Sequence, residues 1–226
     1  MFKTKEKSEN EPWVCSLYNN HGRRLPDRGK RVFENWQLRR QAVTKKVLIL
    51  LAEGFEEIET ATPIDVLRRA GAEVIVAGVS SKTVTGSRGM QVCADVLLDE
   101  YHEIPDAVVL PGGAVGAQNL AGSRKVAEVI KKTHSEKKIV AAICASPALV
   151  LAPLGILNQR KATCYPGLEK KLSSSVTFVK DRVVVDGNVV TSRGPGSAFE
   201  FSFQLAELLF GKSKVEALRE SMLVKG

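Results

Sequence analysis

The stretch "KKVLILLAEGFEEIETATPIDVLRRAGAEVIVAGV", residues 45–79, decides the fold of this chain. It opens with "KKVLILLA" (45–52), a continuous apolar run that is typical of a strand buried on both faces. "EEIETATPIDVLRRAGA" (56–72) has apolar residues at helical spacing, two arginines in its last turn and Gly71 as the expected C-cap. "EVIVAGV" (73–79) is a second buried strand. The stretch therefore predicts a right-handed β-α-β unit.

The same alternation continues along the chain. "DAVVLPGG" (106–113) and "KIVAAIC" (138–144) are further buried strands, and "SRKVAEVIKKTH" (123–134) is an amphipathic helix between them. Segment 82–98 is expected to hold short strands and turns. "RVVVDGNVVTS" (182–192) has Asp-Gly between valine-rich runs, which predicts a type I′ hairpin. The predicted fold class is α/β: a doubly wound, mostly parallel sheet sandwiched by helices, with an antiparallel edge hairpin.

Charge is distributed unevenly along the 226 residues, whose formal net charge is +8. Residues 1–45 carry eleven Lys or Arg against five Asp or Glu, while the remaining residues carry 22 against 20. We therefore expect a basic, disordered leader over residues 1–44 and a single domain over residues 45–226. A basic arm is able to bind polyanions, but the absence of any nucleic-acid motif argues against a nucleic-acid partner. No apolar run approaches the ~18 residues of a membrane span.

The four cysteines, Cys15, Cys93, Cys144 and Cys164, show no C-x-x-C pairing of the metal-binding type. Together with the absence of an export signal, this favours a reduced, cytoplasmic setting and predicts no metal. The acidic residues of the leader argue against an organellar transit peptide, although targeting by the leader stays open.

Ligands of open parallel sheets bind at the carboxyl ends of the strands, and Cys144 lies at such an end. In "VAAICASPALVL" (140–151) the cysteine is followed by Ser146 and Pro147, a typical N-cap and first residue of a helix. The helix end is expected to lower the pKa of the thiol, and the N–H of Ala145 to face an oxyanion. A small buried core cysteine remains the alternative.

Other candidates lie at the same edge. Gly112 and Gly113 are positioned to supply further oxyanion donors, and Arg88 in "GSRGM" to hold a carboxylate or phosphate. Glu59 is singled out because Pro63, four residues later, leaves its carbonyl unpaired and predicts an irregular helix there. Its carboxyl is a candidate general acid or base. None of the three histidines lies at a predicted strand end, so a Cys-His triad is poorly supported.

Several motifs in this order resemble the DJ-1/PfpI superfamily, and specifically its DJ-1 branch. They are "EGFEEIE", "VLPGG" followed by "GAQNL", "AAICASPALVLA" and "TSRGPGSAFEF", and the resemblance covers roughly residues 45–224. It implies a flavodoxin-like fold, a homodimer and no cofactor. It further implies that Cys144 is an oxidation-sensitive nucleophile with a protonated Glu59 as hydrogen-bond partner. Backbone donors would then be Gly112, Gly113 and Ala145, and Arg88 would come from the dimer partner.

Two departures from the family pattern bear on function. The protease-like branch has histidine directly after the cysteine, where this chain has Ala145, so a protease is rejected. Some DJ-1 relatives have histidine where this chain has Tyr165, in "TCYPG". A tyrosine is able to bind a substrate oxygen, but its ordinary pKa of ~10 makes it a poor base at neutral pH.

Two functions follow. The first is a cofactor-independent glyoxalase or protein deglycase, in which Cys144 attacks methylglyoxal, glyoxal or their protein adducts and Glu59 moves the proton. The second is a redox-sensing, chaperone-like stress protein whose Cys144 is oxidised to sulfinate. A cysteine buried beneath a dimer interface, without turnover, is the third reading that the sequence leaves open.

Overall fold

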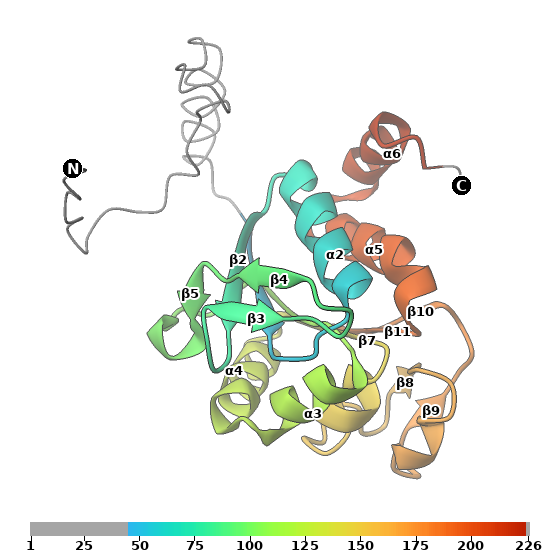
Figure 1. Ribbon diagram of the computed structural model, residues 1–226. Helices are drawn as coiled ribbons and strands as arrows, with labels where there is room; N and C mark the ends of the chain where they lie inside the picture. The colour runs from blue at the N-terminus through green and yellow to red at the C-terminus, as the bar shows by residue number, and fades with distance from the viewer. Residues whose placement is uncertain (1–44, 225–226) are drawn as a thin grey trace, which may run out of the picture. The chain divides into compact units, whose positions relative to one another are not determined.

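A seven-stranded sheet organises residues 45–224, the part of the chain that the computed structural model describes. The expected leader, residues 1–44, lies outside the described residues. The strands follow the spatial order β10-β11-β7-β6-β1-β2-β5 (Figure 1). In chain order they are β1 (Lys46–Leu51), β2 (Glu73–Gly78), β5 (Val96–Leu97), β6 (Ala107–Leu110), β7 (Ile139–Ile143), β10 (Val183–Asp186) and β11 (Val189–Ser192).

The sheet is parallel except at one edge. Every neighbouring pair from β11 to β5 is parallel, and only β10 pairs antiparallel with its neighbour β11. Leu110 of β6 lies opposite Ala142 of β7, so the segments that follow these two strands leave the sheet side by side. The predicted α/β class, including the antiparallel edge, is confirmed.

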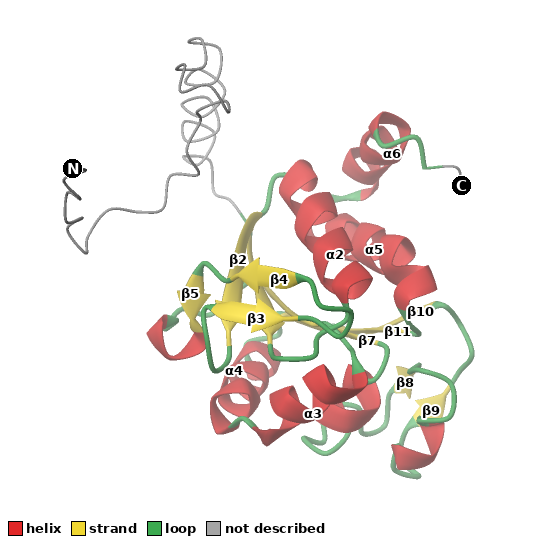
Figure 2. Cartoon of the chain, viewed as in Figure 1, coloured by secondary structure: helices red, strands yellow, loops and turns green. Residues whose placement is uncertain are grey.

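Helices cover both faces of the sheet (Figure 2). Val47, Ile49 and Leu51 of β1 pack toward one apolar cluster, and Leu48 and Leu50 toward the other. Strand side chains alternate between faces, so a strand buried on both faces reads as one continuous apolar run. The first face carries α2 (Glu57–Ala70), α5 (Ala198–Phe210) and α6 (Lys212–Ser221), and the second carries α3 (Ala114–Gly122) and α4 (Arg124–Ser135).

Helix α2 ends as predicted but is more regular than predicted. Gly71 has φ 106° and its N–H closes the last turn on the carbonyls of Leu67 and Arg68. The helix continues through Pro63 without a break. Proline removes one donor, and the remaining bonds of the helix hold the turn, so the irregularity expected near Glu59 does not interrupt the helix.

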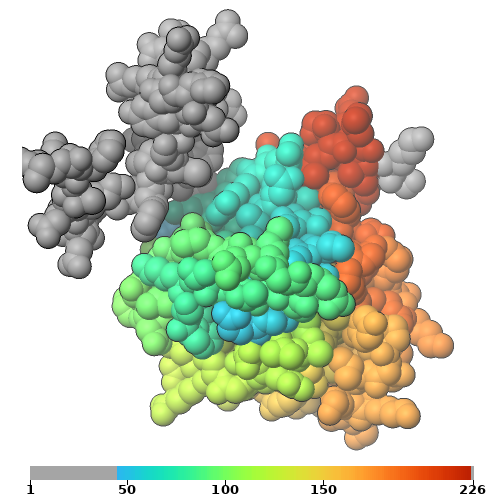
Figure 3. Space-filling model, in the orientation of Figure 1, coloured from blue at the N-terminus to red at the C-terminus, as the bar shows by residue number. Residues whose placement is uncertain are grey.

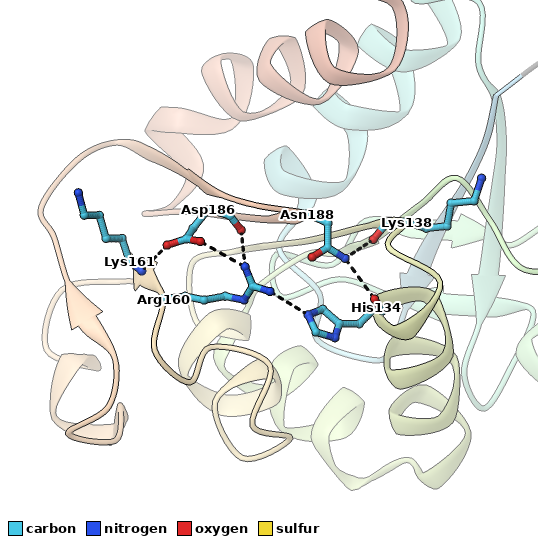
Figure 4. A network of polar contacts seen from close by, with 6 residues as sticks. All are labelled: His134, Lys138, Arg160, Lys161, Asp186 and Asn188. Atoms are coloured by element: carbon cyan, nitrogen blue, oxygen red, sulfur yellow. Dashed lines mark hydrogen bonds and ion pairs between the residues drawn. The ribbon is translucent and has the colours of Figure 1, made fainter.

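The β10–β11 hairpin is present, but its turn is not of the predicted type. The two-residue turn is Gly187–Asn188, and Gly187 has φ 61° whereas Asn188 has no positive φ. A type I′ turn needs positive φ at both positions, so this geometry fits type II′ instead. The Asn188 amide donates to the carbonyls of His134 and Lys138 (3.3 and 2.8 Å), which holds the turn against the α4–β7 loop (Figure 4).

The remaining segments are short. The expected strands of segment 82–98 appear as a two-stranded antiparallel hairpin and as β5. No helix among residues 45–224 is long and apolar enough to cross a membrane. The short elements are β3 (Thr83–Thr85), β4 (Gln91–Cys93), β8 (Lys161–Ala162), β9 (Thr177–Phe178) and the single turns η2 (Leu98–Glu100), η3 (Pro147–Leu151), η4 (Glu169–Lys171) and η5 (Pro195–Ser197).

Candidate active site

Three chain segments that follow parallel strands meet at Gly112. A Cβ added to Gly112 would lie 2.5 Å from the Cβ of Cys144 and 2.5 Å from Oε2 of Glu59. The nucleophile candidate and the carboxyl candidate therefore lie against the same glycine, which has no room for a side chain. The structure thus brings Cys144, Glu59 and Gly112 together at the carboxyl edge of the sheet.

Cys144 occupies a strained turn. Its φ is 64°, in the left-handed region that few non-glycine residues adopt. Two backbone bonds hold the residue there: its N–H donates to the carbonyl of Ser192 (2.9 Å), and its carbonyl accepts from the N–H of Tyr165 (2.8 Å). Strained backbone of this kind costs about 1–3 kcal/mol and persists where the surroundings over-determine it, often at functional sites.

The segment after Cys144 differs from the expected helix. It forms a single five-residue π-helical turn, Pro147–Leu151. Ser146 occupies the N-cap position but its backbone is helical and its side chain caps nothing. Its hydroxyl donates instead to the carbonyl of Pro111 (2.5 Å). So short a helical segment has few aligned peptide dipoles, so its field at the thiol is weak.

The expected lowering of the thiol pKa is therefore wrong. Burial, and then the charge of Glu59, raise the pKa of Cys144 to about 12. Hydrogen bonds from the N–H groups of Gly113 and Ala145 act in the opposite direction, but burial outweighs them. Both amides were expected to face this position, and the structure brings them to the sulfur.

Glu59 has no exposed surface, and burial raises its pKa to about 7. Hydrogen bonds from the Gly112 N–H (2.8 Å to Oε2) and from the Cys144 thiol lower the pKa, and the charge of Glu56 raises it. Oε1 of Glu59 has no hydrogen-bond partner among the described residues. The thiol and the carboxyl titrate as a pair, and near neutral pH the pair carries at most one negative charge.

Tyr165 borders this pair, whereas Arg88 does not approach it within one chain. A Cβ added to Gly194 would lie 3.4 Å from Cδ2 of Tyr165 and 3.9 Å from Oε1 of Glu59, so the ring and the carboxyl flank the same glycine. Arg88 lies at the tip of the β3–β4 hairpin, where its N–H donates to Glu57 (2.5 Å) and its guanidinium to the carbonyl of Ser87.

A polar network holds the segment that carries Tyr165. Arg160 donates to the carboxylate and the carbonyl of Asp186 (3.2 and 2.9 Å) and contacts His134, and the Lys161 N–H donates to the same carboxylate (Figure 4). Two residues later, the Thr163 N–H donates to the hydroxyl of Thr191 (3.0 Å). The chain is thus fixed to the hairpin before it reaches the site. His134 belongs to this network and lies outside the site, as the sequence predicts.

The two reactive groups of the site are largely buried in the single chain. Cys144 is 8% exposed. Two surface cavities, of about 260 and 450 Å³, are lined by other residues. In Figure 3 the segment after β1 (blue) reaches the surface between the β3–β4 hairpin and α3. Chemistry, and not cavity size, therefore identifies the site: within residues 45–224, no other thiol is raised in pKa by a neighbouring buried carboxyl.

Sequence reasoning missed three contributors. The bond from Ser146 to Pro111 replaces the cap that the Ser-Pro pair predicts. Ser192 and Gly194 lie in the "TSRGPG" segment. Ser192 supplies the carbonyl that holds Cys144, and Gly194 leaves the space between Tyr165 and Glu59. The valine-rich run before this segment was the signal for Ser192 and Gly194. Its strand, β11, pairs in parallel with β7 and aligns Ser192 with Ile143, next to Cys144.

Comparison with known proteins shows which family this chain resembles. The sequence model of the DJ-1/PfpI family matches residues 45–208. The Parkinson disease protein 7 homolog of Danio rerio is 42% identical over 80% of this chain and 98% of its own length. The glutathione-independent glyoxalase DJR-1.2 of Caenorhabditis elegans is 36% identical over 78% of this chain and 95% of its own length.

The DJ-1 homologs B and A of Arabidopsis thaliana are 44% and 45% identical over 80% of this chain. The chain matches only 42% and 46% of the length of these two plant proteins.

Solved structures of DJ-1 proteins are similar to this chain as well. Drosophila melanogaster DJ-1beta superposes with a TM-score of 0.76 at 39% identity, covering 81% of this chain and all of its own. Oxidised Toxoplasma gondii DJ-1 gives 0.75 at 39% identity, covering 80% and 98%.

The buried carboxyl has a consequence for stability. Because the pKa of Glu59 is about 7 in the folded chain and ordinarily 4.5, the folded state keeps a proton that the unfolded state releases between these pH values. The contribution of Glu59 to the free energy of unfolding therefore falls as pH rises through this window, by roughly 3 kcal/mol. We expect Glu59→Gln to be more stable than the wild type above pH ~7 and similar to it below pH ~4.5 in urea titrations.

Glu57→Gln is the matched control, since hydrogen bonds from Arg88 and Ser87 lower the pKa of that carboxyl despite its partial burial. Its stability difference from wild type should have the opposite sign above pH ~4.5. A Glu59→Gln variant whose stability difference does not change with pH would contradict the raised pKa.

Proposed function

Because this chain belongs to the DJ-1/PfpI family, we propose that it is a cysteine-dependent glyoxalase that converts methylglyoxal or glyoxal to the hydroxy acid without a cofactor. The observation that carries the proposal is the contact of the Cys144 thiol with the buried carboxyl of Glu59. A relative from Caenorhabditis elegans is named a glutathione-independent glyoxalase, which supports the same reaction class. Adducts of these aldehydes on protein side chains are the alternative substrates, as for a deglycase.

The chemistry needs only the residues of the site. Glu59 takes the thiol proton while Sγ of Cys144 forms a bond to the aldehyde carbon, and it passes this proton to the aldehyde oxygen, giving a hemithioacetal and a free carboxylate. The hemithioacetal oxygen accepts hydrogen bonds from the Gly113 and Ala145 amides, which already face the sulfur. The Glu59 carboxylate then moves the proton from the former aldehyde carbon to the neighbouring carbonyl carbon, while the hydroxyl proton of the first carbon passes to the oxygen of the second. This oxidises the first carbon to a thioester and reduces the second to an alcohol. Water cleaves the thioester and restores the thiol, so atoms and electrons balance without an external oxidant.

Lactate formation from methylglyoxal tests the proposal. We expect Cys144→Ser to be inactive and Glu59→Gln to lose about 10²- to 10⁴-fold in kcat/KM, the usual contribution of a general acid-base. In the wild type kcat/KM should rise with pH with a midpoint near 7, because the pair must lose one proton before the sulfur attacks.

Cys93→Ser removes an exposed thiol outside the site and should retain full activity. Parallel assays with free methylglyoxal and with a methylglyoxal adduct of N-acetylarginine separate glyoxalase from deglycase. Lactate formation that survives in Cys144→Ser sinks the proposal.

A redox function is the second candidate, and the same amides favour it. A sulfinate at Cys144 would place its oxygens against the Gly113 and Ala145 N–H groups, and a protonated Glu59 would donate to it. A related Toxoplasma gondii DJ-1 is known in an oxidised form. Each oxygen is transferred from peroxide, which is reduced to water. In this proposal the oxidised chain acts as a chaperone-like stress protein.

Peptide mass spectrometry after mild peroxide tests this function. The peptide that contains Cys144 should gain two oxygens before the exposed Cys93 does, with Cys93 as the internal control. Oxidation of Cys93 first would exclude selective sensing at Cys144.

We also propose that the chain forms a homodimer over the site. Ile58, Met90 and Val115 are 53%, 50% and 55% exposed, and they come from the elements around the site: α2, the β3–β4 connection and α3. A second copy would cover these apolar side chains and bring its own Arg88 toward the pocket. Light scattering should give a dimer for the wild type and a monomer for Ile58→Glu. Leu208→Glu, at an exposed position on α5, should remain dimeric, and a monomeric wild type would refute the interface.

A further inference from the structure

Ser146 is fully buried two residues after Cys144, and its hydroxyl is not used where the sequence predicts. An N-cap serine has an extended backbone and accepts from the next turn. Ser146 has a helical backbone (φ −64°, ψ −34°), and its hydroxyl donates to the carbonyl of Pro111 at 2.5 Å. This bond joins the turn after β7 to the loop after β6.

The accepting carbonyl belongs to the same peptide group as the N–H that reaches the carboxyl. The Gly112 N–H donates to Oε2 of Glu59 at 2.8 Å, and this bond is buried. The peptide between Pro111 and Gly112 is planar, so rotating its carbonyl also rotates its N–H. One rigid group is therefore held at its oxygen by Ser146 and at its nitrogen by Glu59.

Nothing intrinsic to the chain fixes the orientation of this peptide. Rotation changes ψ of Pro111, which the proline ring leaves free, and φ of Gly112, which glycine tolerates over a wide range. The carbonyl of Gly112 accepts from the Glu56 N–H (3.1 Å), but that bond holds the following peptide. Among the described residues, no backbone N–H donates to the Pro111 carbonyl, so Ser146 is its hydrogen-bond partner.

The bond from Ser146 also affects the ionisation of Glu59. An amide whose oxygen accepts a hydrogen bond is polarised, and its N–H becomes a stronger donor. A stronger donor to Oε2 favours the ionised form of Glu59. The other groups that face this carboxyl are Cys144 and Glu56, with Tyr165 across Gly194.

We propose that Ser146 is a positioning residue for Glu59: its hydroxyl fixes the Pro111–Gly112 peptide so that the Gly112 N–H points at the carboxyl that takes the Cys144 proton. The inference rests on the acid-base role of Glu59 in the proposed function. It goes beyond that role because the Ser146 hydroxyl bonds to the Pro111 carbonyl and acts on the carboxyl through one peptide group.

The test measures Cys144 without turnover. The rate of alkylation by iodoacetamide is followed against pH, with the Cys144 peptide resolved by mass spectrometry. The wild-type rate should rise with a midpoint near pH 7, because the ionised Glu59 takes the thiol proton as the sulfur attacks the reagent. In Ser146→Ala the midpoint should move to higher pH, and the rate at pH 6.5 should fall by about three- to tenfold, the effect expected from the loss of one neutral hydrogen bond.

A matched control separates positioning from loss of packing. Ser202 is equally buried, and its hydroxyl donates to a backbone carbonyl, that of Ala198, at 2.6 Å. Ser202→Ala should lower the melting temperature as Ser146→Ala does, yet its alkylation profile should coincide with the wild type. Ser146→Gly should behave as Ser146→Ala does, because both variants lack the hydroxyl. Ser146→Thr should have the wild-type midpoint, because threonine keeps the hydroxyl.

Either of two results would overturn the proposal: a Ser146→Ala profile that coincides with the wild type, or an equal shift in Ser202→Ala. Failure of the glyoxalase function gives a different outcome. A wild type that alkylates with the expected profile but forms no lactate would refute the reaction while the role of Ser146 is still decided by the alkylation data.

Discussion

The site depends on one constraint: a carboxyl group without exposed surface lies against a thiol at a glycine that has no room for a side chain. Burial disfavours the charged form of both groups, and each charge disfavours the other. The result is a pair in which the first proton leaves near neutral pH and the second far above it. In the proposed function this pair therefore contains its own base, and no histidine is needed to activate the sulfur.

The sheet makes this contact possible. Glu59, Gly112 and Cys144 are far apart in sequence, but each follows a strand of the same parallel sheet, β1, β6 or β7. The register of β6 against β7 sets where the two loops meet, and the positive φ of Cys144 turns the thiol back toward Gly112. Burial and short contacts determine the pKa of the pair, so that pKa depends on where these loops lie.

The sequence predicts what local patterns determine. Apolar runs identify the buried strands, Gly71 ends α2 as its position indicates, and the parallel sheet brings the strand-end residues together. It does not predict what depends on three-dimensional surroundings. A Ser-Pro pair after Cys144 suggests a capped helix, but the chain forms only a π-helical turn, and the hydroxyl finds an unpaired carbonyl in another loop. The expectation of a low thiol pKa was wrong for the same reason. Tertiary packing determines how far burial, which raises this pKa, outweighs the helix dipole and the hydrogen bonds, which lower it.

The two oxygens of the Glu59 carboxyl have different surroundings, which bears on the proton transfers of the proposed reaction. In that reaction the buried carboxyl of Glu59 serves both in the attack of the thiol and in the later transfer between the two carbons. It is suited to both, because a group with a pKa near the working pH accepts and returns a proton with little cost in either direction. Oε2 is occupied by the Gly112 N–H, whereas Oε1 has no partner among the described residues and flanks Gly194 opposite the ring of Tyr165. In the proposed reaction the unpartnered oxygen is therefore the one through which the substrate proton passes, and the bond to the other oxygen holds the carboxyl in place.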